Sequence, residues 1–140
     1  MENIIEISKM QVIMAFVATC IEATARLLNT SYKEVYQRMK NVGMINGNFE
    51  VDSFDFIRDA EKRLVAEMPD SENVQTIIMS NRIGAISVEL AKRLNIEPVK
   101  ALQMFYESKT CEDLHDKSTG LYLYGDLYVA DEFMREKELL

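Results

Sequence analysis

The chain has 140 residues, enough for one domain or for two very small units that share one core. Apolar residues make up 48% of it, which excludes the composition typical of a disordered chain. A net charge of −7 disfavours a nucleic-acid surface, because phosphate binding needs a clustered basic face, and leaves a basic protein as the complementary kind of partner.

The first predicted element is a long helix over residues 4–28, with apolar side chains on two neighbouring faces. Such a helix is buried from two sides, so we expect its own domain to cover one face and a second subunit of a homodimer to cover the other. Its most apolar run, residues 12–21, is ten residues long, half of the roughly 20 needed to span a bilayer. The first residues, MENIIEISK, lack the basic start of a signal peptide. With Cys20 and Cys111 far apart, the sequence predicts reduced thiols and a cytoplasmic protein.

The next elements are two shorter helices. Asn29 is expected to end the first helix, and the hydroxyl of Thr30 or Ser31 to cap a second one over residues 32–41, with Glu34 completing a capping box. A turn at residues 46–48 and a two- or three-residue strand at 49–51 lead to a third helix over residues 54–67. Residues 69–71 are the predicted linker.

The second half of the chain predicts the same order of elements. A long helix over residues 72–94 carries Gly84 at an expected close helix contact, and Asn95 ends it. Pro98 lies in the first turn of a short helix, where proline is tolerated. Residues 116–120 form a turn, and residues 121–124 are one candidate arm of a small hairpin that closes at Gly125. The last predicted helix covers residues 127–138.

The two halves align with each other. Leu28 and Leu94 pair at an offset of 94 − 28 = 66, as do the two Asn stops, and the last helices pair at an offset of 72. We therefore predict a mostly α protein built from two tandem three-helix units, residues 1–68 (a degenerate copy) and 72–140, packed into one globule with room for short β-hairpin-like connectors.

A short motif in the second half resembles a known family. Leu114 and His115 follow a short helix, and a polar turn and an aliphatic–aromatic piece then lead to the sequence Tyr-Val-Ala-Asp at residues 128–131. This order is similar to a family of small bacterial domains of unknown function, which often lie beside ADP-ribosyltransferase-like proteins. The resemblance implies a role as antitoxin or accessory protein to such a partner. It is weaker in the first half, which lacks the Leu-His pair.

Candidate chemical groups are few. His115 is the only histidine, and as a catalytic base it needs an orienting acid and a substrate pocket. Cys111 lies four residues before it, a spacing that a nucleophile–base pair or half a metal site also shows. The sequence offers neither a suitably spaced orienting acid for a catalytic pair nor further ligands for a metal. We therefore interpret Leu114 and His115 as structural and predict no enzyme activity, no metal and no cofactor.

Aromatic side chains provide the candidate binding surface. Tyr122, Tyr124 and Tyr128, together with Phe133, form an aromatic group around the connector, and tyrosine is frequent at interface centres. The sequence thus predicts a non-enzymatic protein-interaction module with a protein partner, without nucleic acid or membrane. The alternative is a dimeric DNA-binding transcriptional regulator, for which Lys33, Arg38 and Lys40 on residues 32–41 are the available cations.

Overall fold

The computed structural model describes residues 2–43, 45 and 70–139, and every regular element in these ranges is a helix. The α-helices are α1 (Glu2–Leu27), α2 (Tyr32–Asn41), α4 (Asp70–Leu94), α5 (Pro98–Tyr106), α6 (Lys109–His115) and α7 (Asp126–Glu136). Two 3-10 turns, η2 (Lys117–Thr119) and η3 (Leu121–Leu123), connect α6 to α7. The predicted mostly α class is confirmed for the described part of the chain.

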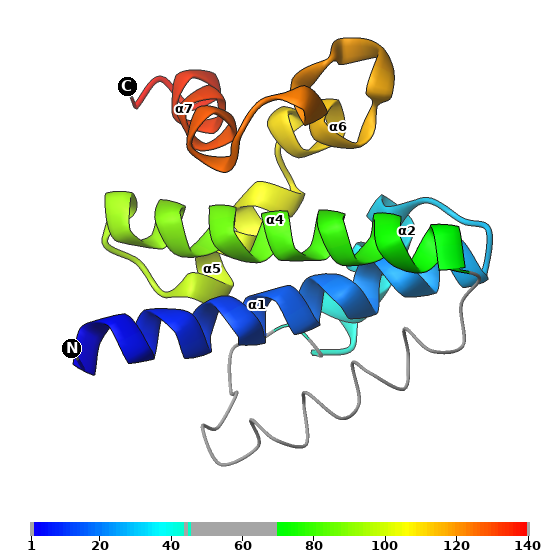
Figure 1. Ribbon diagram of the computed structural model, residues 1–140, viewed down its shortest axis with the longest axis horizontal. Coiled ribbons are helices and arrows are strands. Elements are labelled where there is room, and N and C mark those ends of the chain that lie inside the picture. The colour runs from blue at the N-terminus through cyan, green and yellow to red at the C-terminus, as the bar shows by residue number, and fades with distance from the viewer. Residues whose placement is uncertain (1, 44, 46–69, 140) are drawn as a thin grey trace.

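The two long helices form the centre of the molecule. α1 and α4 lie side by side and run in opposite directions, and the shorter helices surround them (Figure 1). The two helices approach closely at Gly84 of α4, because a Cβ built there would lie 2.8 Å from both Ala15 N and Gln11 O of α1. The close helix contact predicted at Gly84 is therefore present. The largest fully buried side chains come from both long helices, α5, α6 and α7: Ile13, Met14, Ile21, Ile83, Ile86, Leu90, Leu102, Phe105, Leu114, Val129 and Phe133.

The ends of the two long helices have the same geometry. Asn29 after α1 and Asn95 after α4 both adopt the left-handed conformation, with φ of 51° and 54°. In each case the amide of the following residue donates to the carbonyl five residues earlier, at 2.9 Å and 3.0 Å. Tyr32 begins α2 and Pro98 begins α5, again an offset of 98 − 32 = 66. This agreement supports the predicted repeat, which stays a prediction because residues 46–69 lie outside the described ranges.

The prediction of a hairpin arm at residues 121–124 is wrong. The segment forms the 3-10 turn η3, and no strand occurs in the described residues. Gly120 has a φ of 74°, a conformation that favours glycine, and it separates η2 from η3. The amides of Leu123 and Tyr124 donate to carbonyls three residues earlier, at 3.1 Å and 3.0 Å, so local turns satisfy them instead of a partner strand. The strand at 49–51 and the helix at 54–67 lie outside the described residues, and α4 begins at Asp70, inside the range predicted for the linker.

The apolar stretch of α1 is longer than its ten-residue run indicated. Lys9–Leu27 covers 19 residues with a mean hydropathy of 1.4, enough by length and composition to cross a membrane. Of its apolar window, 56% is buried inside the protein, as in the core helix of a soluble protein. Packing against α4 accounts for this apolar character, so the stretch is weak evidence for a membrane span.

Candidate functional site

The Leu-His motif lies at the end of α6 and faces α1. Leu114 is 1% exposed and belongs to the core. His115 Nε2 lies 2.8 Å from Glu22 Oε1 of α1, and His115 Nδ1 lies 2.8 Å from the carbonyl oxygen of Cys111. The motif therefore joins α6 to the central helix, and the structural role expected for it stays a prediction.

This geometry determines where protons lie. Both ring nitrogens of His115 face oxygen atoms that accept hydrogen bonds, so both contacts are satisfied when both nitrogens carry hydrogen. The hydroxyl of Tyr106 donates to the other Glu22 oxygen at 2.9 Å. Burial lowers the pKa of His115, but the hydrogen bond and charge of Glu22 outweigh it, and the pKa is raised above its ordinary value. Glu22 therefore favours the protonated, charged form of the His115 imidazole.

Aromatic rings cover the imidazole. The Tyr32 ring of α2 stacks on His115 at a centroid distance of 3.8 Å and an angle of 13°, and Tyr106 lies against both Tyr32 and Tyr36. Cys111 is fully buried, and burial first, then the charge of Glu22, raises the pKa of its thiol. A neutral, inaccessible thiol is not suited to nucleophilic attack. Within residues 2–43, 45 and 70–139, no three His, Cys, Asp or Glu side chains are grouped to hold a metal ion.

The Glu22–His115 pair predicts a pH-dependent stability. In the unfolded chain a histidine has a pKa of about 6.5, and in the folded protein the pKa of His115 is higher. Protonation of His115 therefore stabilises the folded state fully at pH values below the unfolded pKa. This stabilisation is lost as the pH rises through the folded pKa. We expect the free energy of unfolding to fall between pH 6 and pH 8.5, by about 1.4 kcal/mol for each unit of the shift. Urea unfolding at both pH values measures it.

The control for this pH prediction is His115→Gln, which keeps a donor toward Glu22 but cannot titrate. The other groups near the ring are Tyr32 and Cys111, whose pKa values are both raised mainly by burial, and Arg26, whose charge opposes protonation of the imidazole. None of these is predicted to reverse the sign between pH 6 and pH 8.5. A wild-type pH dependence equal to that of the variant would contradict the prediction.

A partly buried arginine of α4 holds the segment that carries the candidate tyrosines. Arg82 of α4 has only 16% of its side chain exposed. Its Nε donates to Asp126 Oδ1 at 2.9 Å, its Nη1 donates to the carbonyl of Tyr122 at 2.7 Å, and its Nη2 donates to the carbonyl of Tyr124. One planar guanidinium therefore ties η3 and the first residue of α7 to the central helix.

The segment held by Arg82 exposes five large side chains within seven residues. Their exposed fractions are 40% for Tyr122, 74% for Leu123, 53% for Tyr124, 62% for Leu127 and 40% for Tyr128. The rings of Tyr124 and Tyr128 stack at a centroid distance of 4.4 Å. We name these five residues the η3–α7 patch. All three predicted tyrosines lie in it, and two leucines join them.

Phe133 does not lie on this surface. It is fully buried, with its ring 6.2 Å from that of Phe105, and is a core residue. The buried face of α7 consists of Val129, Ala130, Phe133 and Met134. Two pairs in this set are spaced by four residues, Val129 with Phe133 and Ala130 with Met134, a pattern that the sequence contains and that predicts one helix face.

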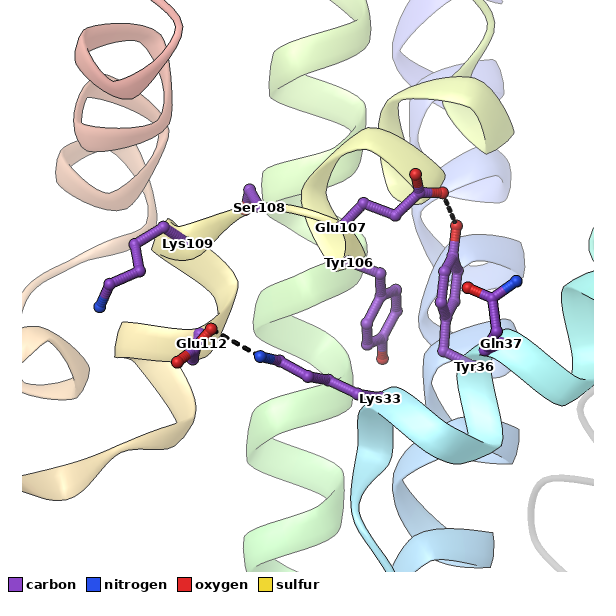
Figure 2. A pocket seen from close by; sticks show the side chains of 8 residues that line it. All are labelled: Lys33, Tyr36, Gln37, Tyr106, Glu107, Ser108, Lys109 and Glu112. Atoms are coloured by element: carbon purple, nitrogen blue, oxygen red, sulfur yellow. Dashed lines mark hydrogen bonds and ion pairs between the residues drawn. The ribbon is translucent and has the colours of Figure 1, made fainter.

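Two hollows open on the surface near α6. The first, of about 330 Å³, lies between α2 and the junction of α5 with α6 (Figure 2). Its charges are already paired: Lys33 with Glu112 at 2.6 Å, and Glu107 with both the Tyr36 hydroxyl and Lys40. The second, of about 290 Å³, adjoins the η3–α7 patch and includes Tyr124 and Tyr128 in its lining.

Sequence reasoning missed Glu22, Arg82 and Tyr106. Each is separated from its partners by 40 or more positions, so no local spacing indicates the contact. The one available signal was a polar residue on an apolar helix face: Glu22 follows Ile21 at the end of the apolar run. Such a buried carboxylate needs a partner, and the only histidine was the plausible one.

Comparison of the chain with protein-family models, curated proteins and solved structures finds no match. The resemblance carried by Leu114, His115 and residues 128–131 stays an expectation.

Proposed function

We propose that this protein is a non-enzymatic protein-interaction module that docks a partner on the η3–α7 patch. The observation that carries the proposal is the exposure of five large side chains, from 40% to 74%, on one continuous segment. Exposed apolar side chains grouped on one segment are typical of binding sites, whereas single exposed apolar residues need no explanation. Tyrosine and leucine together provide the apolar area, and the phenol groups keep the free surface soluble.

The backbone of the patch is already in place before a partner arrives. Arg82 bonds the carbonyls of Tyr122 and Tyr124, and Asp126 receives the same guanidinium. A preorganised segment loses little conformational entropy on binding, which favours affinity. This support distinguishes the patch from a loop that exposes apolar residues only because it is loosely packed.

A narrower proposal concerns the identity of the partner. We infer an ADP-ribosyltransferase-like protein, with this module as its antitoxin or accessory protein. The support is the resemblance of the Leu-His motif and of residues 128–131, together with the net charge of −7, which complements a cationic nucleotide-binding cleft. A cytoplasmic location belongs to the same proposal.

The patch is tested by the double variant Leu123→Ser/Leu127→Ser, with Leu28→Ser as matched control. Leu28 is 65% exposed and lies at the end of α1, outside the patch. We expect the patch variant to lose at least tenfold of the partner recovered in a tagged pull-down from the native host, quantified by mass spectrometry, because it removes two large anchors. All three sites are exposed, so the free energy of unfolding should change by only about 0.5 kcal/mol per substitution.

Each outcome of the pull-down has a definite meaning. Loss of a stoichiometric partner with the patch variant alone supports the module. If that partner is an ADP-ribosyltransferase-like protein, the narrower proposal is supported as well, and a different protein refutes it. Equal recovery by the wild type, the patch variant and the control contradicts docking at the patch.

The DNA-binding alternative receives less support from the geometry. The three cations of α2 are paired with acids: Lys33 with Glu112, Arg38 with Glu34 and Lys40 with Glu107. DNA binding would instead need these charges directed at phosphates. A mobility shift on genomic DNA that weakens steeply with salt would favour the regulator.

The homodimer also stays a proposal. Val12 and Phe16, one turn apart on α1, are only partly buried within one chain and provide the face for a second copy. Light scattering after size-exclusion chromatography measures the mass directly. A mass of one chain at micromolar concentration contradicts the dimer.

A further inference from the structure

The hollow beside the η3–α7 patch has an uneven chemical lining. Seven side chains form it: Thr110, Asp113, Thr119, Leu121, Tyr124, Tyr128 and Glu132. Two of them are carboxylates and two are the stacked tyrosines, and none of the described lining residues is Lys or Arg. Its volume of about 290 Å³ is large enough for the end of a long side chain.

The two threonines do not determine what binds. The Thr110 hydroxyl donates to Glu136 Oε1 at 2.6 Å, and the Thr119 hydroxyl donates to the carbonyl of Asp113 at 2.6 Å. Their donor hydrogens are thus already used within the protein. The groups that remain to recognise a ligand are the exposed Tyr124 and Tyr128 and the carboxylates of Asp113 and Glu132, which form ion pairs at the surface with Lys109 and Arg135.

Carboxylates beside aromatic faces attract one class of ligand. An ammonium or guanidinium group gains charge-assisted hydrogen bonds from a carboxylate and a cation–π contact from a ring. The aliphatic part of a lysine or arginine side chain packs against the rings in the same position. An anion would meet two like charges here.

We propose that this hollow accepts a lysine or arginine side chain of the protein that docks on the η3–α7 patch. The inference rests on the proposed function and deepens it, since it assigns a chemistry to the partner: an apolar surface with a basic residue at its edge. The patch supplies contact area, and the hollow supplies selectivity for the cation.

Two cations of the protein itself already form ion pairs with these carboxylates, although neither cation lines the hollow. Lys109 Nζ lies 2.5 Å from Asp113 Oδ1, and Arg135 pairs with Glu132. Their side chains are 65% and 53% exposed, and ion pairs at such exposure contribute little net stability. A partner's cation can replace them, and it adds contact with the rings. Removal of Lys109 should therefore strengthen binding.

The direct test is an NMR titration of the whole protein with two blocked tripeptides, acetyl-Gly-Lys-Gly-amide and the same peptide with norleucine in place of lysine. The norleucine peptide has the aliphatic chain without the ammonium group. We expect the lysine peptide, at millimolar concentration, to shift the amide signals of Asp113, Tyr124 and Glu132, with an effect that weakens as salt is added. Equal shifts from both peptides, or none from either, would overturn the proposal.

Variants locate the binding. Asp113→Asn and Glu132→Gln should each weaken binding of the lysine peptide by about threefold or more, and Lys109→Ala should strengthen it. Glu97→Gln removes the same charge from the exposed start of α5, where its side chain makes no capping bond, and should leave the affinity unchanged. Equal weakening by all three charge-removing variants would show general electrostatic attraction only and overturn the site.

The pull-down separates this inference from the proposed function. If Leu123→Ser/Leu127→Ser loses the partner and Asp113→Asn/Glu132→Gln keeps it, docking on the patch is supported and the cation site is refuted. If both double variants lose the partner while Glu97→Gln retains it, both proposals are supported. If neither double variant loses the partner, both proposals are refuted.

Discussion

Replacing Glu22 with Ala is expected to lower the free energy of unfolding by about 3–5 kcal/mol. The substitution leaves the largely buried His115 without its counter-charge and the buried Tyr106 hydroxyl without its acceptor. Tyr106 is 2% exposed, so its hydroxyl does not recover a hydrogen bond to water without opening the contact between α1 and α5. Against a typical stability of about 5–15 kcal/mol, this is a large fraction.

Chemical denaturation at pH 6 measures the effect of Glu22→Ala, and Glu112→Ala is the control. Glu112 also joins two helices, through Lys33 at 2.6 Å, but both side chains are about half exposed, so its loss should cost less than about 1 kcal/mol. Glu22→Gln should fall between the two, because its amide oxygen still accepts from Tyr106. An Ala variant at Glu22 no less stable than the Glu112 control would refute the central role of the buried pair.

The second large effect is expected at Gly84. A Cβ at this position would lie 2.8 Å from backbone atoms of both Ala15 and Gln11, and backbone cannot move aside as a side chain can. Gly84→Ala gains about 1 kcal/mol of helix propensity but should still destabilise the protein, since overpacking costs typically 1–3 kcal/mol. Gly84→Leu must separate α1 from α4, and we expect it to cost more than about 3 kcal/mol.

Asn81→Ala is the control for Gly84, since Asn81 lies on α4 about one turn earlier and is exposed. It also improves helix propensity, without the clash, so its effect should be neutral or slightly stabilising. Thermal and urea unfolding of the three variants compare the effects directly. If Gly84→Ala is as stable as the wild type, the backbone contact is looser than the structure describes.

The ends of the two long helices and the starts of α2 and α5 were predictable because they depend on neighbouring residues. Asn29 and Asn95 end their helices in the left-handed conformation, which asparagine tolerates better than most residues. Half of the predicted capping box is present: Ser31 Oγ accepts from the amide of Glu34 at 3.2 Å. The Glu34 carboxylate accepts from the Thr30 hydroxyl at 2.6 Å, whereas a capping box would use the backbone amide of Ser31. Pro98 is the first residue of α5, a position that proline favours because its fixed φ is already helical.

The connector between α6 and α7 was less predictable. Residues 121–124 have the aliphatic–aromatic composition of a strand, but a strand needs a partner, and none lies beside this segment in the described part of the chain. The segment instead forms 3-10 turns, and Arg82 binds the carbonyls that local turns leave open. The rotation of α7 about its own axis then decides which of its aromatic residues belong to the core. In the structure Phe133 faces the core and Tyr128 faces the surface.

By itself, the sequence determined that this protein is mostly helical, that Asn29 and Asn95 end the two long helices and that Gly84 lies at a close contact. These features arise from propensity, capping and side-chain size over a few residues. Only the tertiary structure decided that Glu22 meets His115, 93 positions away, and that Arg82 fixes Tyr122 and Tyr124. Such contacts depend on how whole helices pack, and packing is a property of the complete core. The candidate binding surface is a product of that packing, since Tyr128 would be a core residue on a rotated α7 and Arg82 holds the backbone of Tyr122 and Tyr124.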